Sequence, residues 1–332
     1  MSTEVSSKAL SDGYEVAIAG GGIAALTAGL YSARLGRRTL VLTGGAPGGL
    51  LLSINEIEGV PGFPEGVPGY ELCPMVQEQA AESGAEFEMT ELAGLEPDGE
   101  GWRLATDGAE YTARSLILAT GAHLRELGVE GEQRLQGRGV SHCASCDAPL
   151  LRDKVVGVVG GGDSALQEAL TLAEEVSEVI VLVRGDELAA QATYRERALA
   201  HPKISFRHGA IVEEVLGDDQ VAGVRLGDGS ELELSGLFVY IGLQPNTALV
   251  ADHLTLDADG HVPVDGRLRT ELPGLFAAGV LRRDAAGQAT GSAGDGALAA
   301  KATHDYLDHG GWAEEIPAEA AAVASGNGGT HA

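Results

Sequence analysis

The feature that most constrains the fold of this chain is a glycine-rich segment that occurs twice. Each copy, at 20–25 and 160–165, follows a short apolar run and precedes a stretch with helical character. In the pattern Gly-x-Gly-x-x-Gly/Ala, the first glycine allows a tight turn, the second lets the backbone approach a pyrophosphate, and the small third residue lets the helix pack on the strand. The matching positions are Gly20, Gly22 and Ala25 in the first copy and Gly160, Gly162 and Ala165 in the second. One copy alone would also fit an ordinary glycine-rich turn, but two in this setting predict an α/β fold with two dinucleotide sites.

Just before the second copy lies Cys143-Ala144-Ser145-Cys146-Asp147, which holds two of the three cysteines. A Cys-x-x-Cys pair can close into a disulfide and reopen, and the pKa of the reactive thiol in such motifs commonly falls below its free value. Asp147 is placed to exchange a proton with a leaving thiolate, and His142 either acts directly or only tunes the thiol. A structural disulfide, a zinc site and chance spacing are the alternatives, but so short a loop stabilises little and structural zinc needs four ligands. The sequence therefore favours redox chemistry at the two cysteines.

The composition narrows the class of protein. The chain has 332 residues, with 22 Lys and Arg against 49 Asp and Glu, for a formal net charge of -27. Such a surface repels phosphate backbones and anionic lipid, so neither nucleic acid nor a membrane is an expected partner. The cysteine usage suits a reducing compartment, and neither a signal peptide nor an apolar run of about 20 residues is present. We therefore expect a cytoplasmic protein with two domains.

The remaining pattern predicts the elements around these motifs. We expect strands at 15–19, 39–43, 115–119, 154–159 and 179–183, helices at 23–35, 70–83 and 297–307, and an antiparallel meander that includes 204–215. Cys73 is expected to be a small core residue. Arg184 could pair with a nucleotide 2′-phosphate, or be a plain surface charge, while Asp186 could accept from a free 2′-hydroxyl. The Ala-, Gly- and Ser-rich end, 313–332, predicts a disordered tail.

The order of the motifs is distinctive. The first fingerprint is followed by Gly48-Gly49 with a Pro-Gly loop, then Ala119-Thr120-Gly121, Cys-x-x-Cys-Asp, the second fingerprint and a closing segment 276–279. From about 15 to 307 the chain resembles the low-molecular-weight thioredoxin reductases and their flavoprotein relatives. The resemblance implies two doubly wound, Rossmann-like domains, the second inserted into the first. A discontinuous FAD-binding domain would span 14–125 and 246–312, and an NAD(P)H-binding domain that carries the cysteines would span 126–245.

The same resemblance implies roles for individual residues. Cys146 would face the flavin, Cys143 would exchange with substrate, and Asp147 would be the acid and base. The nicotinamide nucleotide would lie on Gly160, Gly162, Ala165 and Arg184. The FAD contacts would come from Gly20, Gly22, Ala25, Gly48, Gly49, Thr120, Gly279, Gln288, Ala289 and Asp295. No metal site is implied.

Some positions depart from the family pattern. Polar or charged residues of the family's flavin site are replaced at Leu50, Gly59, Val280 and Gly287. Each change removes a polar partner, and a hydrogen bond to a neutral group is typically worth about 0.5–1.5 kcal/mol. Near Arg184, two of the family's three phosphate-binding arginines are replaced, by Gly185 and Ala189. The nicotinamide cofactor is therefore NADPH or NADH.

These observations lead us to expect a flavin-dependent thiol-disulfide oxidoreductase. Electrons would pass from NADPH or NADH through FAD and the Cys143–Cys146 disulfide to a thioredoxin-like protein or a small disulfide, in a homodimer. A dithiol oxidase that passes electrons to oxygen is one alternative, supported by the missing arginines. A flavin-poor, non-catalytic member of the fold is another, supported by the lost flavin contacts.

Overall fold

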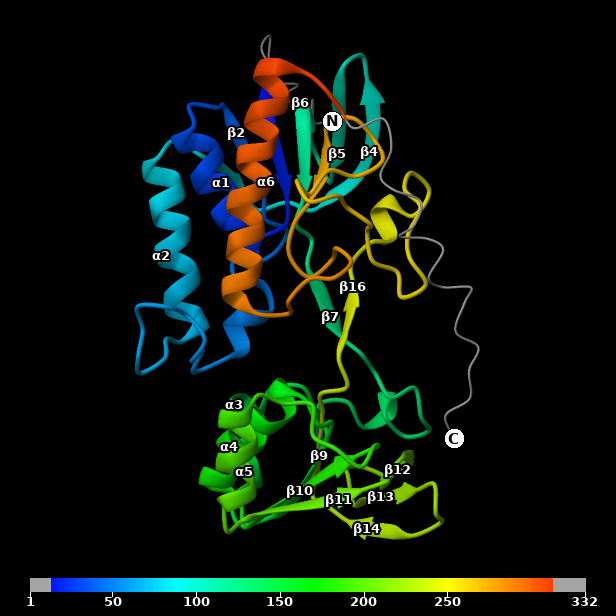
Figure 1. Ribbon diagram of the computed structural model, residues 1–332. Coiled ribbons are helices and arrows are strands. Elements are labelled where there is room, and N and C mark those ends of the chain that lie inside the picture. Colours follow the sequence, from blue (N-terminus) through cyan, green and yellow to red (C-terminus); the bar gives the residue numbers. More distant parts are fainter. Residues whose placement is uncertain (1–12, 313–332) are drawn as a thin grey trace, which may run out of the picture. The chain divides into compact units, whose positions relative to one another are not determined.

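The computed structural model describes residues 13–312, so the predicted tail at 313–332 lies outside the described residues. The chain divides into two compact units. Among the described residues, one unit is built from 13–122 together with 245–312, and the other, green in Figure 1, is built from His123–Gln244. The second unit is thus inserted in the sequence of the first.

The first unit is organised around a seven-stranded sheet, in the order β3-β2-β1-β6-β5-β4, with β17 also paired to β6. The strands β1, β2, β3, β6 and β17 form parallel pairs, and β4, β5 and β6 form antiparallel ones. Their bounds are β1 Tyr14–Ala19, β2 Thr39–Leu42, β3 Glu86–Glu88, β4 Leu92–Asp98, β5 Gly101–Thr106, β6 Glu110–Leu118 and β17 Leu275–Ala277. The strands predicted from apolar runs are present, and the parallel pairs are those of a nucleotide-binding α/β sheet.

Alternate side chains of β1 lie in two separate hydrophobic cores, because successive side chains of a strand point to opposite faces of the sheet. Val16 and Ile18 pack with α1 (Ile23–Arg34) and α6 (Ala289–His309), whereas Ala17 and Ala19 pack on the opposite face. Figure 1 shows α6 running beside α1. The close approach depends on Gly296, where an added Cβ would lie 2.2 Å from the Ala24 carbonyl oxygen. The helix that follows the first glycine segment, α1, therefore packs against the sheet on one side and against α6 on another.

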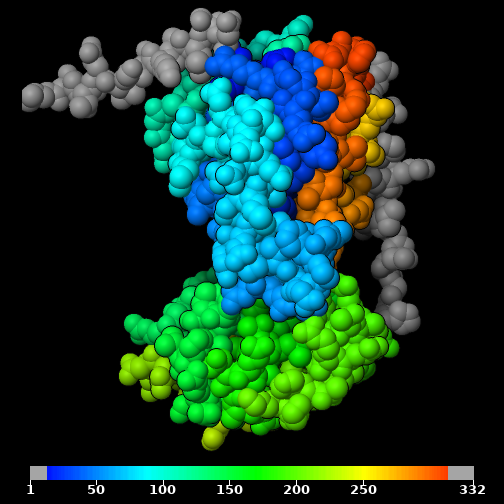
Figure 2. Space-filling view, turned by 90° about the vertical axis from the view of Figure 1, so that its left-hand side faces the viewer, coloured from blue at the N-terminus to red at the C-terminus, as the bar shows by residue number. Residues whose placement is uncertain are grey.

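Helix α2 (Gly69–Glu82) lies against α1 and forms part of the cyan surface in Figure 2. It is amphipathic: Leu72 and Cys73 are buried, while Tyr70 and Met75 are exposed. Burial raises the pKa of the Cys73 thiol to about 11, so it is uncharged at neutral pH. The prediction of a core cysteine is confirmed.

The second unit contains a five-stranded parallel sheet, in the order β11-β10-β9-β15-β8. Helices α3, α4 and α5 pack on one face of this sheet. A three-stranded antiparallel sheet, β12-β13-β14, packs on the opposite face through a second hydrophobic core. The strand bounds are β8 Val140–Ser141, β9 Val155–Val159, β10 Glu178–Val183, β11 Ile204–His208, β12 Val212–Leu216, β13 Gly223–Leu226, β14 Glu231–Glu233 and β15 Gly236–Val239. The helices are α3 Ala144–Asp147, α4 Asp163–Glu175 and α5 Ala192–Ala200. The other described elements are four short 3-10 helices, η1 Gly49–Ser53, η2 Gln133–Leu135, η3 Ala148–Leu151 and η4 Ala248–Val250, and a two-stranded ribbon of β7 Ala122–Leu124 and β16 Leu243–Pro245.

Two predicted elements were wrong in detail. The stretch 204–215 is not one strand of the meander, because β11 pairs in parallel with β10 and only β12 belongs to the antiparallel sheet. The helix predicted at 297–307 begins eight residues earlier, at Ala289. Asp295, expected at the start of that helix, therefore lies in its second turn, and the N-cap is Gln288.

Among the residues that the structure describes, no helix combines the length and the apolar character needed to cross a membrane.

Candidate active site

The two cysteines of the second unit are joined. Cys143 and Cys146 form a disulfide, with their Cα atoms 5.3 Å apart. The short helix α3 starts directly after Cys143 and places Asp147 beside the second sulfur in sequence. Cys146 is exposed and Cys143 is half-buried. The pair is therefore accessible to a thiol or another electron donor, and it is not a core cross-link.

The residues before the disulfide hold the turn but bring no positive charge to it. The Ser141 hydroxyl accepts a hydrogen bond of 3.0 Å from the Cys143 backbone N–H. Burial lowers the pKa of His142, against opposing effects of Glu132 and Glu126, so the imidazole is neutral at pH 7. A neutral ring cannot stabilise a thiolate by charge. The role that remains for His142 is a structural one in the turn. Within 13–312, no group of three or more His, Cys, Asp or Glu side chains is arranged to hold a metal ion.

The second glycine segment connects β9 to α4 in the way its pattern predicts. Gly160 has a φ of +139°, and a Cβ there would lie 2.2 Å from the Tyr240 carbonyl oxygen, so only glycine fits this turn. Gly162 is the N-cap of α4, no described side chain caps that helix, and nothing lies within 4 Å of where its Cβ would be. The backbone N–H groups at the start of α4 therefore face open space.

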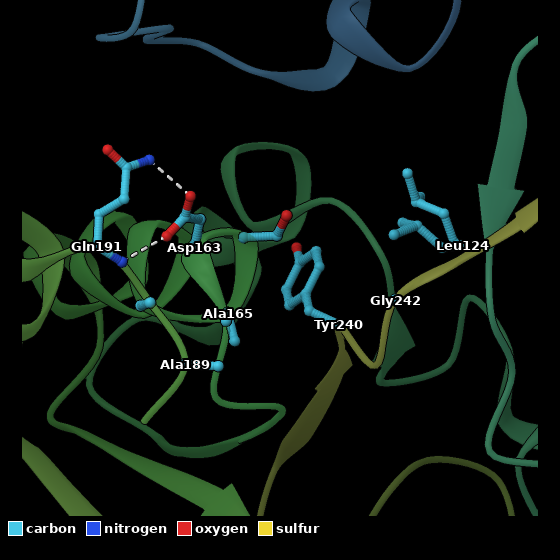
Figure 3. Close-up of a pocket in the computed structure, with 11 residues that line it drawn as sticks. Leu124, Asp163, Ala165, Ala189, Gln191, Tyr240 and Gly242 are labelled. Carbon is cyan, nitrogen blue, oxygen red and sulfur yellow. Dashed lines mark hydrogen bonds between the residues drawn. The ribbon is translucent and has the colours of Figure 1, made fainter. Parts of the chain in front are cut away.

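That space is a cavity of about 370 Å³, shown in Figure 3. Gly162 and Ala165 line it, as the pattern predicts, and so do Tyr240, Gln191 and Leu124, which the sequence did not single out. Gly160 forms the turn behind the cavity, and Arg184 is exposed and is not among the lining residues.

One rim of the cavity is fixed by Asp163 and Gln191. The Gln191 backbone N–H donates to one oxygen of the Asp163 carboxylate at 2.7 Å, and the Gln191 Nε2 donates to the other at 2.6 Å (Figure 3). The backbone N–H groups of Ala189 and Ala190 donate to the Gly161 carbonyl oxygen. The loop that follows β10 is therefore tied to the glycine turn.

The first glycine segment is built in the same way. Gly20 has a φ of +131° and no room for a Cβ, which would lie 2.0 Å from the Ala119 carbonyl oxygen. Gly22 is the N-cap of α1, with open space in front of it. Gly48 donates a backbone hydrogen bond of 2.7 Å to the Gly21 carbonyl oxygen, and Gly49 lies against Gly22. Four predicted FAD contacts thus meet at one helix N-terminus, with Ala25 buried in the first turn.

Other predicted FAD contacts surround this point. Gly279 approaches Ala24, and its N–H donates to Asp295 at 3.0 Å. Asp295 also accepts two hydrogen bonds from the Arg282 guanidinium, at 2.7 and 2.8 Å. This bidentate pair fixes the turn at Val280, where the family's aspartate is missing.

Three predicted contacts lie at the ends of secondary-structure elements. Thr120 follows β6, and its hydroxyl donates to the Asn246 carbonyl oxygen. Gln288 and Ala289 begin α6, and the Gln288 side chain comes near Gly59. The Thr290 hydroxyl donates to the Gly59 carbonyl oxygen at 2.7 Å, so the loop that lacks the family's asparagine is still tied to α6.

Both glycine turns fit a dinucleotide. Each offers an uncapped helix N-terminus, a glycine whose Cβ position is empty, and a second glycine that no other residue could replace. Helix N-termini attract phosphate groups through their N–H donors and their partial positive charge.

Comparison with known proteins agrees with this geometry. The profile of the family described as pyridine nucleotide-disulphide oxidoreductase matches residues 14–296. The chain belongs to this family. As a member it is an FAD-dependent disulfide oxidoreductase that works with a nicotinamide nucleotide.

Within this pyridine nucleotide-disulphide oxidoreductase family, the chain is similar to many thioredoxin reductases. The chain is 38% identical to a thioredoxin reductase of Treponema pallidum, over 89% of this chain and 97% of the relative. It is 40% identical to that of Mycolicibacterium smegmatis, over 86% and 94%. The crystal structure of Lactococcus lactis thioredoxin reductase is similar, with a TM-score of 0.86 and 36% identity over 89% of this chain and 99% of that chain. The predicted family and its two Rossmann-like domains are confirmed.

The sequence missed one charged residue next to the cysteines. Glu168 is 9% exposed on α4, and the Ala144 backbone N–H and the Tyr240 hydroxyl both act on its carboxylate. A possible signal was the position of a carboxylate on the apolar side of a helix, three and four residues from Ala165 and Leu172.

Proposed function

We propose that this chain reduces the disulfide of a thioredoxin-like protein with electrons from a nicotinamide nucleotide. The observation that carries the proposal is the accessible Cys143–Cys146 disulfide, in the same unit as a glycine turn and a nucleotide-sized cavity. We assign FAD to the first unit and the nicotinamide nucleotide to the second, on the site residues predicted from the sequence. When bound, FAD supplies two-electron chemistry that connects a hydride donor with a disulfide.

The chain's own residues then carry out thiol-disulfide exchange. Two electrons and one proton convert the Cys143–Cys146 disulfide to one thiol and one thiolate. Cys143, as a thiolate, attacks a substrate sulfur and forms a mixed disulfide, and Cys146 attacks Cys143 to release the reduced substrate. Asp147 holds or returns the proton of the thiol that leaves. We further propose that the protein is cytoplasmic and that it forms a homodimer. Size-exclusion chromatography with light scattering would test the homodimer.

The absorbance spectrum of the purified protein tests the flavin and its electron source together. We expect flavin bands, and we expect them to bleach under anaerobic conditions with NADPH or NADH. Absence of flavin, also after incubation with FAD, would favour the non-catalytic member of the fold. Flavin that bleaches with a dithiol but with neither nucleotide, followed by oxygen consumption, would favour the dithiol oxidase.

Gly185→Arg is expected to shift the preference toward NADPH. The position is free of strain, with no atom within 4 Å of an added Cβ, and it follows Arg184 in a loop that also carries Asp186 and Glu187. A second guanidinium beside Arg184 would bind a 2′-phosphate by charge-assisted hydrogen bonds, so KM for NADPH should fall about tenfold relative to NADH. Gly185→Gln, which adds length without charge, is the control. Equal KM ratios in both variants would show that no 2′-phosphate binds at this loop.

A further inference from the structure

Glu168 is an ionisable residue on a helix face that is otherwise apolar and buried. The buried face of α4 consists of Ala165, Leu166, Ala169, Leu172, Ala173 and this one glutamate. A carboxylate removed from water is costly unless hydrogen bonds compensate it. The position therefore needs an explanation beyond helix formation.

Its partners connect the disulfide to the wall of the cavity. One is the backbone N–H of Ala144, the residue that directly follows Cys143 and is itself fully buried. The other is Tyr240, a lining residue of the cavity (Figure 3), whose hydroxyl faces the carboxylate. In the described part of the chain, no acceptor has good hydrogen-bond geometry toward this hydroxyl, which is buried.

Burial is the largest influence on Glu168 and raises its pKa to about 7, while the Ala144 N–H and Tyr240 oppose the rise. Burial and Glu168 together raise the pKa of Tyr240, so the tyrosine stays protonated and can only donate. Asp147, on α3, also acts on Tyr240.

The neighbouring elements leave few other charges to consider. On the same helix, Glu175 is paired with Arg152, which follows η3. On α5, Tyr194 is buried in the same core and Arg195 donates to the Leu188 carbonyl oxygen.

We propose that Glu168 is a proton-holding, positioning residue for the Cys143–Cys146 disulfide: it takes up a proton when the disulfide is reduced and releases it on reoxidation. This rests on the proposed function in one respect, that the disulfide cycles between oxidised and reduced forms. Two electrons break the S–S bond, one proton goes to one sulfur, a second proton goes to the Glu168 carboxylate, and the other sulfur remains a thiolate. The charges of the two electrons and the two protons cancel, so the site carries one negative charge before reduction, on Glu168, and one after it, on the second sulfur.

The physical reason is repulsion between two nearby negative charges. A thiolate formed one residue from Ala144 adds negative charge close to the carboxylate, in surroundings where charge is poorly screened. Proton binding to Glu168 is then expected to be about tenfold or more tighter in the reduced protein. Below about pH 7 the carboxyl is already protonated in the oxidised protein, so uptake on reduction is expected above pH 7 and not below it.

The test is the pH dependence of the disulfide midpoint potential in the full-length protein. The protein is equilibrated in dithiothreitol redox buffers from pH 6 to 8.5, and thiols are trapped by alkylation and counted by mass, with Cys73 as a constant background. Each proton taken up changes the equilibrium constant tenfold per pH unit, or about 30 mV for two electrons. We expect a one-proton slope in Glu168→Gln. For a tenfold change in proton affinity, the wild-type slope near pH 7.5 should be steeper by about half a proton, or about 15 mV per pH unit.

Glu174→Gln is the matched control, because Glu174 is exposed on the same helix, and it should keep the wild-type slope. An identical slope in wild type and Glu168→Gln overturns the proposal. Should Glu168→Gln fail to fold, redox-difference infrared spectroscopy of the wild type at pH 8 gives the second measurement. A protonated-carboxyl band should appear on reduction and shift in Tyr240→Phe, and its absence would also overturn the proposal.

The titration needs neither flavin, nicotinamide nor thioredoxin. Suppose that the expected slope difference is found but the protein does not reduce thioredoxin. That result would reject the proposed function and leave this inference standing.

Discussion

Cys143→Ser is expected to abolish turnover with a disulfide substrate while leaving reduction of bound flavin by the nicotinamide nucleotide intact. The substitution removes the sulfur that forms the mixed disulfide, and a hydroxyl in its place is a far weaker nucleophile. Loss of a nucleophile typically lowers kcat by 10³-fold or more. Anaerobic bleaching of the flavin measures the first half of the reaction, and a thioredoxin assay measures the second.

The third cysteine provides the control for this experiment. Cys73 is fully buried in the first unit, and its pKa is raised to about 11. Cys73→Ala should therefore keep turnover within about twofold of the wild type, with only a modest loss of stability. Residual turnover of more than about a hundredth in Cys143→Ser would mean that another group carries electrons to the substrate.

Gly20→Ala is expected to unfold the flavin site, and Gly22→Ala to spare the fold but weaken flavin binding. At Gly20 a side chain meets both a φ of +131° and the Ala119 carbonyl oxygen at 2.0 Å. Backbone strain of this kind costs on the order of 1–3 kcal/mol, and the steric overlap adds to it. At Gly22 the φ is −74° and the space is open, so an added methyl group would occupy only the approach of a pyrophosphate.

Thermal unfolding with and without added FAD separates the two effects. Gly20→Ala should lower Tm in both conditions, whereas Gly22→Ala should match the wild type without FAD and gain less from its addition. A Gly22→Ala variant that is stabilised by FAD as much as the wild type would argue against a pyrophosphate at this turn.

The sequence predicted those parts of the fold that depend on local chemistry. Both glycine turns, the strands before them and the helices after them follow from residues that are adjacent in sequence. The pairing of β11 does not, because a segment of alternating character such as 204–208 has the same pattern whether it joins a parallel or an antiparallel sheet.

The start of α6 was missed for a related reason. Gly291, Gly294 and Gly296 lower the helix propensity of its first turns. The helix forms there because it packs on α1, where Gly296 fits against Ala24.

The candidate site divides in the same way. The disulfide pair and the phosphate-facing glycines could be read from spacing, since each forms its structure locally. Glu168, Tyr240 and Gln191 come from three separate segments and meet only through the tertiary fold. A single carboxylate on an apolar helix face is an irregularity in the sequence, and only the fold shows that it lies behind the cysteines.

The ribbon of β7 and β16 has a consequence for how such a protein can change over evolutionary time. Where the chain leaves and re-enters the first unit, the Asn246 N–H donates to the Gly121 carbonyl oxygen at 3.0 Å, and the Asn246 side chain donates to the Thr120 carbonyl oxygen. The two ends of His123–Gln244 are therefore neighbours, which is the condition under which a whole domain can be inserted or exchanged without disturbing its host. The disulfide, Glu168 and the cavity are encoded together between these ends. Exchange of this segment, with one crossover at each end, would transfer the disulfide, the cavity and the proton-holding residue together to a new host domain.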